Sequence, residues 1–223
     1  MKAEGKNLDD SPGLSRALAW WEIVSVFSSG LIIEWVVLAL ADKNKLITAI
    51  PVLLVAALML ISHRERGETL RDIGLRTDNF LSACRLLLLP TALAVVLIFT
   101  AAWWMGYPIF AQPWRIRFLS LPLWTFVQQY CLNGFINRRA QFAFGKVLNS
   151  VMLVAVVFSL LHLPSPLLTL STLIGGLVWA ATYQRQPNLF ALTLSHTIVS
   201  LTVALTMRPS LLYSLRVGFK YLN

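Results

Sequence analysis

The residues that could carry chemistry stand out because they interrupt long apolar runs. Gln128, Gln129, Cys131 and Asn133 lie in one such run. Gln129 and Asn133 are four residues apart and share a helix face. Gln128 and Cys131, three residues apart, share a neighbouring face. Amide groups inside a membrane helix either join helices by hydrogen bonds or line a polar site, so the spacing predicts a polar patch on one helix.

Two histidines provide two further polar groups. His162 follows Phe158 by four residues and comes just before Pro164, where a helix has to end. His196 precedes Ser200 by four residues, so these two side chains share a helix face. Each imidazole could donate a proton to a backbone carbonyl, or it could take part in proton transfer. Two histidines on separate polar-patched helices favour one shared site.

Two carboxylates interrupt the first apolar run. Glu22 and Glu34 are twelve residues apart, which corresponds to about 18 Å along a helix. They therefore cannot both lie at one site near the middle of a membrane. We expect each to lie near an interface or to pair with a cation such as Arg16.

The elements that must position these residues are membrane helices. The chain has 223 residues, of which 57% are hydrophobic and 13% are charged. Soluble domains contain about a quarter charged residues, so this composition excludes a water-soluble enzyme, a disordered chain and a small disulfide scaffold. Seven stretches approach the roughly 20 apolar residues that span a bilayer: 17–41, 46–62, 81–105, 117–136, 147–163, 166–183 and 187–207. The sequence predicts an all-α, polytopic transmembrane helical bundle with about seven spans.

We expect three parts along the chain. N-terminal transmembrane helices with a cytoplasmic loop occupy 1–116, core helices with the polar site occupy 117–207, and a basic amphipathic tail occupies 208–223. The first apolar run is expected to be a retained helix, because it is too long and too interrupted for a signal peptide. The connectors carry eleven cations on the N-terminal side of the membrane and seven on the other. This imbalance favours a multi-pass protein of the cell membrane with a cytoplasmic N-terminus.

The net charge of +9 results mainly from missing acids. All ten acidic residues precede Asn79, whereas residues 79–223 contain ten basic residues and no carboxylate side chain. The lipid bilayer accounts for the basic character better than nucleic acid does, and we expect no nucleic-acid partner. Chemistry in the later part of the chain has to proceed without a local Asp or Glu.

The order of the polar motifs resembles that of a known family. The three motifs read Gln-Gln-x-x-x-Asn-Gly, Phe-x-x-x-His and His-x-x-x-Ser. This is similar to the CAAX protease and bacteriocin-processing family (CPBP, also called Abi) of intramembrane endopeptidases. That family's pattern is Glu-Glu-x-x-x-Arg, Phe-x-x-x-His and His-x-x-x-Asn. The resemblance covers about residues 120–205, and it implies an all-helical bundle with a cavity open toward the membrane.

The resemblance also implies a role for each matching residue. In the family, the first Glu activates a water for attack on a peptide carbonyl, and the first His assists it. Gln128 stands at the position of that Glu, Gln129 at the second Glu and Asn133 at the Arg. His162 matches the first family His.

The last family motif stabilises the oxyanion through its His and Asn. Here His196 matches that His, and Ser200 replaces the Asn. The resemblance therefore implies a site with Gln128, Gln129, His162, His196 and Ser200 in the catalytic positions. The remaining motif residues, Asn133, Phe158 and Cys131, would support the site or bind substrate.

The substitutions change the chemistry, because an amide cannot act as a general base as a carboxylate does. Replacing both Glu and the Arg together leaves a neutral, hydrogen-bonded patch and avoids an unpaired buried charge. Three routes could restore catalysis. His162 could accept the proton from a water that Gln128 orients, Cys131 could act as a nucleophile, or a carboxylate from Glu22 or Glu34 could enter the cavity.

The predicted function is a CPBP-type endopeptidase that hydrolyses peptide bonds of lipidated, prenylated or membrane-embedded peptides. The alternative is a catalytically impaired family member that binds such peptides in an immunity or scaffold role. We expect no cofactor. We also expect no metal, because zinc sites use three or four ligands and the matching region offers only two histidines. If the prediction is right, Gln128, His162 and His196 converge within the reach of one water.

Overall fold

A computed structural model describes residues 12–40, 44–107, 119–207 and 217–219. Every regular element in these ranges is helical, and five helices are long and apolar enough to cross a membrane. These are Ser15–Leu40, Leu46–Glu65, Phe80–Trp104, Pro166–Arg185 and Leu189–Thr206, and a shorter apolar helix covers Leu148–Leu160. The predicted all-α membrane bundle is confirmed.

The elements follow one another along the chain with short connections. They are α1 (Pro12–Ile32), the π-helix η2 (Ile33–Val37), α2 (Leu38–Leu40), α3 (Lys45–Glu65), α4 (Leu70–Ile73), α5 (Phe80–Trp104), α6 (Leu121–Gln129), the π-helix η4 (Tyr130–Asn137), α7 (Arg138–Phe144), α8 (Leu148–Leu160), α9 (Pro166–Arg185) and α10 (Leu189–Thr206). Each of the seven predicted apolar stretches is helical over most of its length. The fourth stretch is divided between α6 and η4. The predicted tail at 208–223 lies outside the described residues except for 217–219.

Local sequence explains where the membrane helices begin. Asn188 caps α10, because its Oδ1 accepts a hydrogen bond from the backbone N–H of Ala191 at 2.9 Å. Asn44 caps α3 in the same way. Pro166 stands at the first position of α9, where its missing N–H is not needed.

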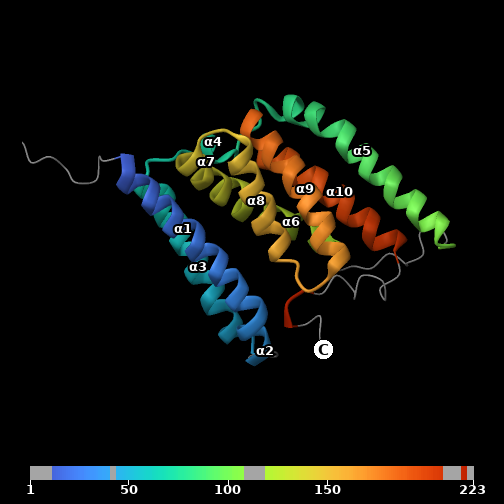
Figure 1. The fold of residues 1–223 in the computed structure, drawn as a ribbon, viewed down its shortest axis with the longest axis horizontal. Helices are drawn as coiled ribbons and strands as arrows, with labels where there is room; N and C mark the ends of the chain where they lie inside the picture. Colours follow the sequence, from blue (N-terminus) through green and yellow to red (C-terminus); the bar gives the residue numbers. More distant parts are fainter. Residues whose placement is uncertain (1–11, 41–43, 108–118, 208–216, 220–223) are drawn as a thin grey trace, which may run out of the picture.

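Figure 1 shows two groups of helices that meet at α7. In the first group α1 runs beside α3, and α1 also packs against α7. In the second group α8 and α9 form a hairpin, and α10 packs against both α5 and α6. The main apolar core lies around η4, where Leu132, Phe135 and Ile136 are buried together with Val154 and Leu192. The helix that carries the first polar motif therefore runs through the centre of the second group.

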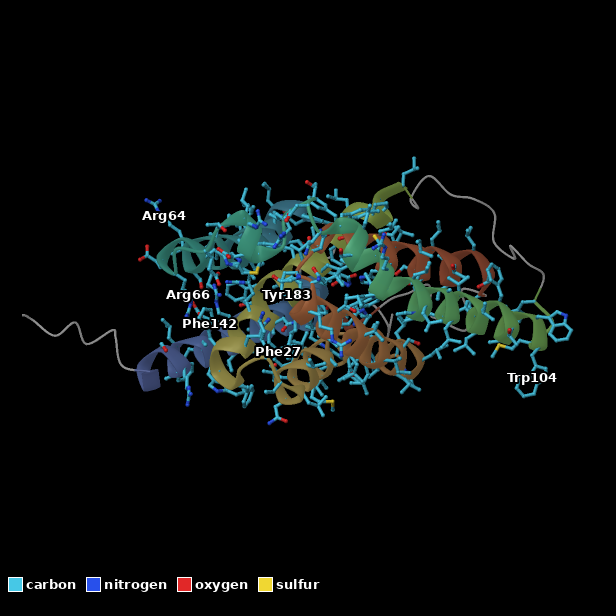
Figure 2. The ribbon with its side chains drawn as sticks, turned by 90° about the horizontal axis from the view of Figure 1, so that it is seen from above. Phe27, Arg64, Arg66, Trp104, Phe142 and Tyr183 are labelled. Atoms are coloured by element: carbon cyan, nitrogen blue, oxygen red, sulfur yellow. The ribbon has the colours of Figure 1, made fainter. Side chains whose placement is uncertain are left out.

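The outer faces of α3 and α5 expose large apolar side chains, as expected for surfaces that contact lipid tails. At the end of α5, Trp103 and Trp104 are among the most exposed side chains, and Figure 2 shows Trp104 at the opposite end of the molecule from Arg64. Tryptophan is enriched where a membrane meets water. We therefore treat the chain as a multi-pass integral membrane protein.

The loop between α3 and α5 is tied to the turn between α9 and α10. Tyr183 Oη donates to the carbonyl oxygen of Ile73 at 2.7 Å, and the N–H of Leu189 donates to the carbonyl oxygen of Gly74 at 2.8 Å. Gly74 has a φ of 91°, and a Cβ there would lie 3.0 Å from the Tyr183 ring. Only glycine fits this position without strain, so the loop and the turn are held together.

Candidate active site

A ladder of amide side chains runs along one face of the motif helix. Asn133 Nδ2 donates to Gln129 Oε1 at 2.7 Å, and Asn137 Nδ2 donates to Asn133 Oδ1 at 2.9 Å. All three side chains are fully buried. The four-residue spacing of Gln129 and Asn133 thus produces a hydrogen-bonded row, and Asn137 extends it through the π-helix. π-Helical turns often mark functional positions.

The far end of the ladder joins three helices. Asn137 Oδ1 accepts from Gln141 Nε2 and from Gln184 Nε2, each at 3.1 Å, and Gln184 also donates to Ser150 Oγ at 2.8 Å. We did not predict these four residues as part of the site. Asn137 and Gln141 continue the four-residue spacing of the motif and could have been found from it. Gln184 and Ser150 lie on other helices, where no pattern in the sequence indicates them.

The near end of the ladder reaches His196. Gln129 Nε2 lies 3.2 Å from His196 Nδ1. Because Gln129 Oε1 already accepts from Asn133, its amide nitrogen faces the ring and donates to Nδ1. His196 therefore carries its proton on Nε2, which is free to donate. The ring is buried and lies 4.3 Å from the Trp179 ring, and Trp179 Nε1 donates to Ser195 Oγ at 3.1 Å.

His162 has the opposite tautomer. It lies in the turn after α8, and its Nδ1 is 2.8 Å from the carbonyl oxygen of Phe158. A carbonyl oxygen can only accept a hydrogen bond, so Nδ1 carries the proton. The lone pair of His162 is consequently on Nε2, where it can accept a proton from another molecule.

Phe158 brings the two histidines to one place. Its ring centroid lies 4.8 Å from that of His162 and 5.8 Å from that of His196, in both cases edge to face. His196 is also close enough to His162 to interact with it electrostatically. A proton acceptor and a proton donor from two helices therefore flank the same aromatic side chain.

The other predicted site residues are not joined to this network. Gln128, Cys131 and Ser200 are half-buried, and none of them makes a hydrogen bond with the residues that the structure describes. Ser200 still lies one turn after His196 on the same helix. Gln128 precedes Gln129 at the end of α6.

The acidic side chains of the first helix make their contacts elsewhere. Arg66 Nη2 donates to Glu22 Oε2 at 2.7 Å, Arg139 Nε lies 3.1 Å from the same oxygen, and the Ser62 hydroxyl donates to Glu22 Oε1. The cations that pair with Glu22 are thus Arg66 and Arg139, in place of the expected Arg16. Glu34 lies in η2, and the structure gives it no hydrogen bond to either histidine of the candidate site.

A cluster of charges lies at the other end of the motif helix. Arg138 Nε donates to Glu68 Oε1 at 2.7 Å, and Arg139 Nη1 donates to both Glu68 oxygens at 2.9 Å. His63 Nδ1 is hydrogen-bonded to the same carboxylate. Burial alone would raise the pKa of Glu68, but the His63 hydrogen bond and the charges of Arg139 and Arg138 lower that pKa to about 2. Glu68 is therefore a permanent carboxylate at neutral pH.

The cluster extends to aromatic rings. The Arg66 guanidinium lies 4.9 Å from the centroid of the Phe142 ring, and Figure 2 shows these two side chains close together. The Arg139 guanidinium lies 4.6 Å from the centroid of the Phe135 ring. Cations over ring faces gain from the ring quadrupole, which helps to hold Arg139 in a fully buried position.

No group of three or more His, Cys, Asp or Glu side chains in the described part of the chain is placed to hold a metal ion. The two histidines of the candidate site have amide, carbonyl and aromatic neighbours. The chemistry that this arrangement offers is proton acceptance at one imidazole and hydrogen-bond donation at the other.

Comparison with protein families agrees with the motif analysis. Residues 114–202 match the model of the family described as Rce1-like, type II CAAX prenyl endopeptidase Rce1-like. This segment contains every residue of the amide ladder and both histidines. Searches of curated proteins and of solved structures found no match.

Proposed function

From the assignment of residues 114–202 to the CPBP family of CAAX-type endopeptidases, we propose that this chain hydrolyses peptide bonds of lipidated, prenylated or membrane-embedded peptides. The observation that carries the proposal is the opposite proton placement on His162 and His196 around Phe158. Hydrolysis requires one group that accepts a proton from water and another that stabilises the developing oxyanion. The two imidazoles provide one of each.

His162 is the general base of the proposed reaction. Its Nε2 accepts a proton from a water as the water oxygen adds to the peptide carbonyl carbon. The resulting imidazolium then returns the proton to the nitrogen of the leaving peptide as the C–N bond breaks. The Phe158 carbonyl holds Nδ1–H throughout and so fixes the ring orientation.

His196 is the proposed donor to the oxyanion. Gln129 fixes its tautomer through Nδ1, so that Nε2–H is available when negative charge develops on the carbonyl oxygen. Ser200, one helical turn along, supplies a hydroxyl as a second donor. A donor held in place by the buried ladder needs little reorganisation during the reaction.

Gln128 completes the proposed site by orienting the water. Its side chain is half-buried and forms no hydrogen bond with a described residue, so its amide is available to a water or a substrate. Asn133, Phe158 and Cys131 have supporting roles in this scheme. Neither Glu22 nor Cys131 is needed as a base or nucleophile.

The second candidate function is a binding protein that holds the same class of peptide without cleaving it. The neutral ladder favours this alternative, because no carboxylate is hydrogen-bonded to either histidine. For the chain as a whole we propose membrane helices in 1–116, the site in 117–207 and a basic tail in 208–223. We also propose a cell-membrane location with a cytoplasmic N-terminus, from the distribution of connector cations.

The test is a cleavage assay with purified protein in detergent and a mixture of prenylated and transmembrane peptides, read by mass spectrometry. We expect cleavage, and we expect His162→Ala to lower its rate by about 10²–10⁴-fold, the usual value of general-base assistance. Thr202→Ala is a matched control, since its hydroxyl bonds only the Ile198 carbonyl and lies on an exposed face.

Two results would change the assignment. Cleavage that survives His162→Ala would show that the proposed site is wrong. If the natural chain does not cleave but Gln128→Glu creates activity, the binding function is correct. Thermal unfolding of each variant separates loss of activity from loss of fold.

A further inference from the structure

A second imidazole–carboxylate pair lies away from the candidate active site. His63, near the end of α3, is 4% exposed, and its Nδ1 is hydrogen-bonded to Glu68. A carboxylate can only accept, so Nδ1 carries a proton. The outer nitrogen, Nε2, therefore determines what this histidine can bind.

His63 Nε2 is buried and has no hydrogen-bond partner among the described residues. The hydroxyl of Tyr130 shares this condition. The two rings lie 5.9 Å apart between centroids, and the Tyr130 hydroxyl is close enough to Glu68 and Arg139 to interact with them electrostatically. Two unpaired polar atoms thus border the same small, charged volume.

Buried polar groups in proteins are almost always hydrogen-bonded, to protein atoms or to ordered water. Nε2 requires a partner in either protonation state, because it accepts when the ring is neutral and donates when the ring is charged. The Tyr130 hydroxyl can donate or accept, so its chemistry complements both states. The two atoms do not bond each other directly.

We propose that His63 and Tyr130 bind one water molecule between Nε2 and the hydroxyl, so that Glu68, His63, the water and Tyr130 form a hydrated acid–base site. A buried water typically makes about three hydrogen bonds to otherwise unsatisfied groups. In this arrangement the water can give a proton to Nε2, and Glu68 and Tyr130 stabilise the resulting ion pair. The site extends beyond the proposed peptidase function and does not depend on it.

The packing around the site keeps it separate from the histidines of the candidate active site. The His63 ring meets Phe135 edge to face at 5.3 Å, and Gly134 leaves room for the Tyr130 ring, since a Cβ there would lie 3.2 Å from Tyr130 Cδ2. Tyr130 follows Gln129 directly along the chain. The motif helix thus contributes Gln129 to one polar site and Tyr130 to the other.

The test uses the full chain in lipid nanodiscs with ¹⁵N-labelled histidine. The sequence contains only three histidines, so single substitutions assign every ring signal. We expect magnetisation transfer from water protons to the His63 ring, with the Nε2 resonance shifted upfield by its hydrogen bond. In Tyr130→Phe the water loses a partner, and we expect the transfer to weaken severalfold and the resonance to move back downfield.

Tyr183→Phe is the matched control, because its hydroxyl bonds the Ile73 carbonyl outside this site. It should leave both His63 readouts unchanged. Absence of water transfer in the natural chain, or a direct coupling between Nε2 and the Tyr130 hydroxyl proton, would overturn the proposal. His162→Ala should abolish peptide cleavage without moving the His63 signals, so failure of either proposal can be recognised independently.

Discussion

The two ends of the motif helix solve the problem of buried polarity in different ways. At the end near His196, the row from Gln129 to Asn137 consists of neutral amides that satisfy one another through hydrogen bonds. At the other end, Arg139 is fully buried with its charge opposed by Glu68 and Glu22. Both arrangements leave few unpaired groups, but only the second carries net charges.

The difference follows from position relative to the membrane. A charged side chain at the centre of a bilayer costs several kcal/mol more than one near an interface, whereas paired amides carry no such penalty. The amide ladder occupies the segment where the resembled family has two Glu and one Arg. The charges of this chain are concentrated at the end of the helix, beside the loop that supplies Glu68. The absence of acids after Asp78 is therefore a consistent feature of the site.

The largest expected effect in this comparison comes from the charged cluster. Arg139→Met removes the cation that pairs with Glu68 and Glu22 and leaves two carboxylates partly unopposed in a buried place. Breaking such a pair costs about 3–5 kcal/mol of unfolding free energy. The measurement is unfolding in detergent followed by tryptophan fluorescence. Glu68→Gln in the Arg139→Met background should recover part of the loss, and purely additive effects would show that the two side chains are not coupled.

The next prediction converts one region into the other. Asn133→Arg places a cation among neutral amides and should destabilise the chain by several kcal/mol, because a buried charge needs a partner. Gln129→Glu together with Asn133→Arg rebuilds the family's ion pair one helical turn apart and should recover most of the lost stability. A double-mutant cycle on unfolding free energy measures this coupling. If both single variants are neutral, the ladder is exposed to water and the comparison fails.

The cluster also predicts a pH dependence that the ladder lacks. The pKa of Glu68 falls from 4.5 to about 2 on folding, so the carboxylate contributes stability above pH 4.5. That contribution should decrease as the pH falls from about 4.5 toward 2, because the unfolded chain then binds a proton that the folded chain excludes. Glu68→Gln should flatten this part of the profile. The same scan on Asn133→Leu should keep the natural slope, since the ladder has no group that titrates there.

The sequence predicts the elements well because each membrane helix is a long apolar run with its own start and stop signals. The shared face of Gln129 and Asn133 also follows from spacing alone, and a 2.7 Å hydrogen bond joins them. Partners on distant segments could not be found in this way. Glu22 meets Arg139 across 117 positions of sequence, and such a pairing depends on how α1 packs against α7. His63 and Glu68 are five residues apart across a helix end, where no helical periodicity applies.

The smallest predicted effect tests whether the ladder is uniform along its length. Gln141 forms the outer rung, where its Nε2 donates to Asn137 Oδ1 from a half-buried position. Asn137 Oδ1 keeps its hydrogen bond from Gln184 when this rung is removed, so Gln141→Ala should cost only about 0.5–1.5 kcal/mol, the net value of one hydrogen bond. Asn133→Leu leaves two buried amides without partners, and it should cost about 1–3 kcal/mol for each group. Equal losses in the two variants, measured by unfolding in detergent, would mean that both rungs have the same solvent access. A gradient between them would locate the neutral, dry part of the ladder next to His196, where the proposed oxyanion donor needs a fixed and desolvated partner.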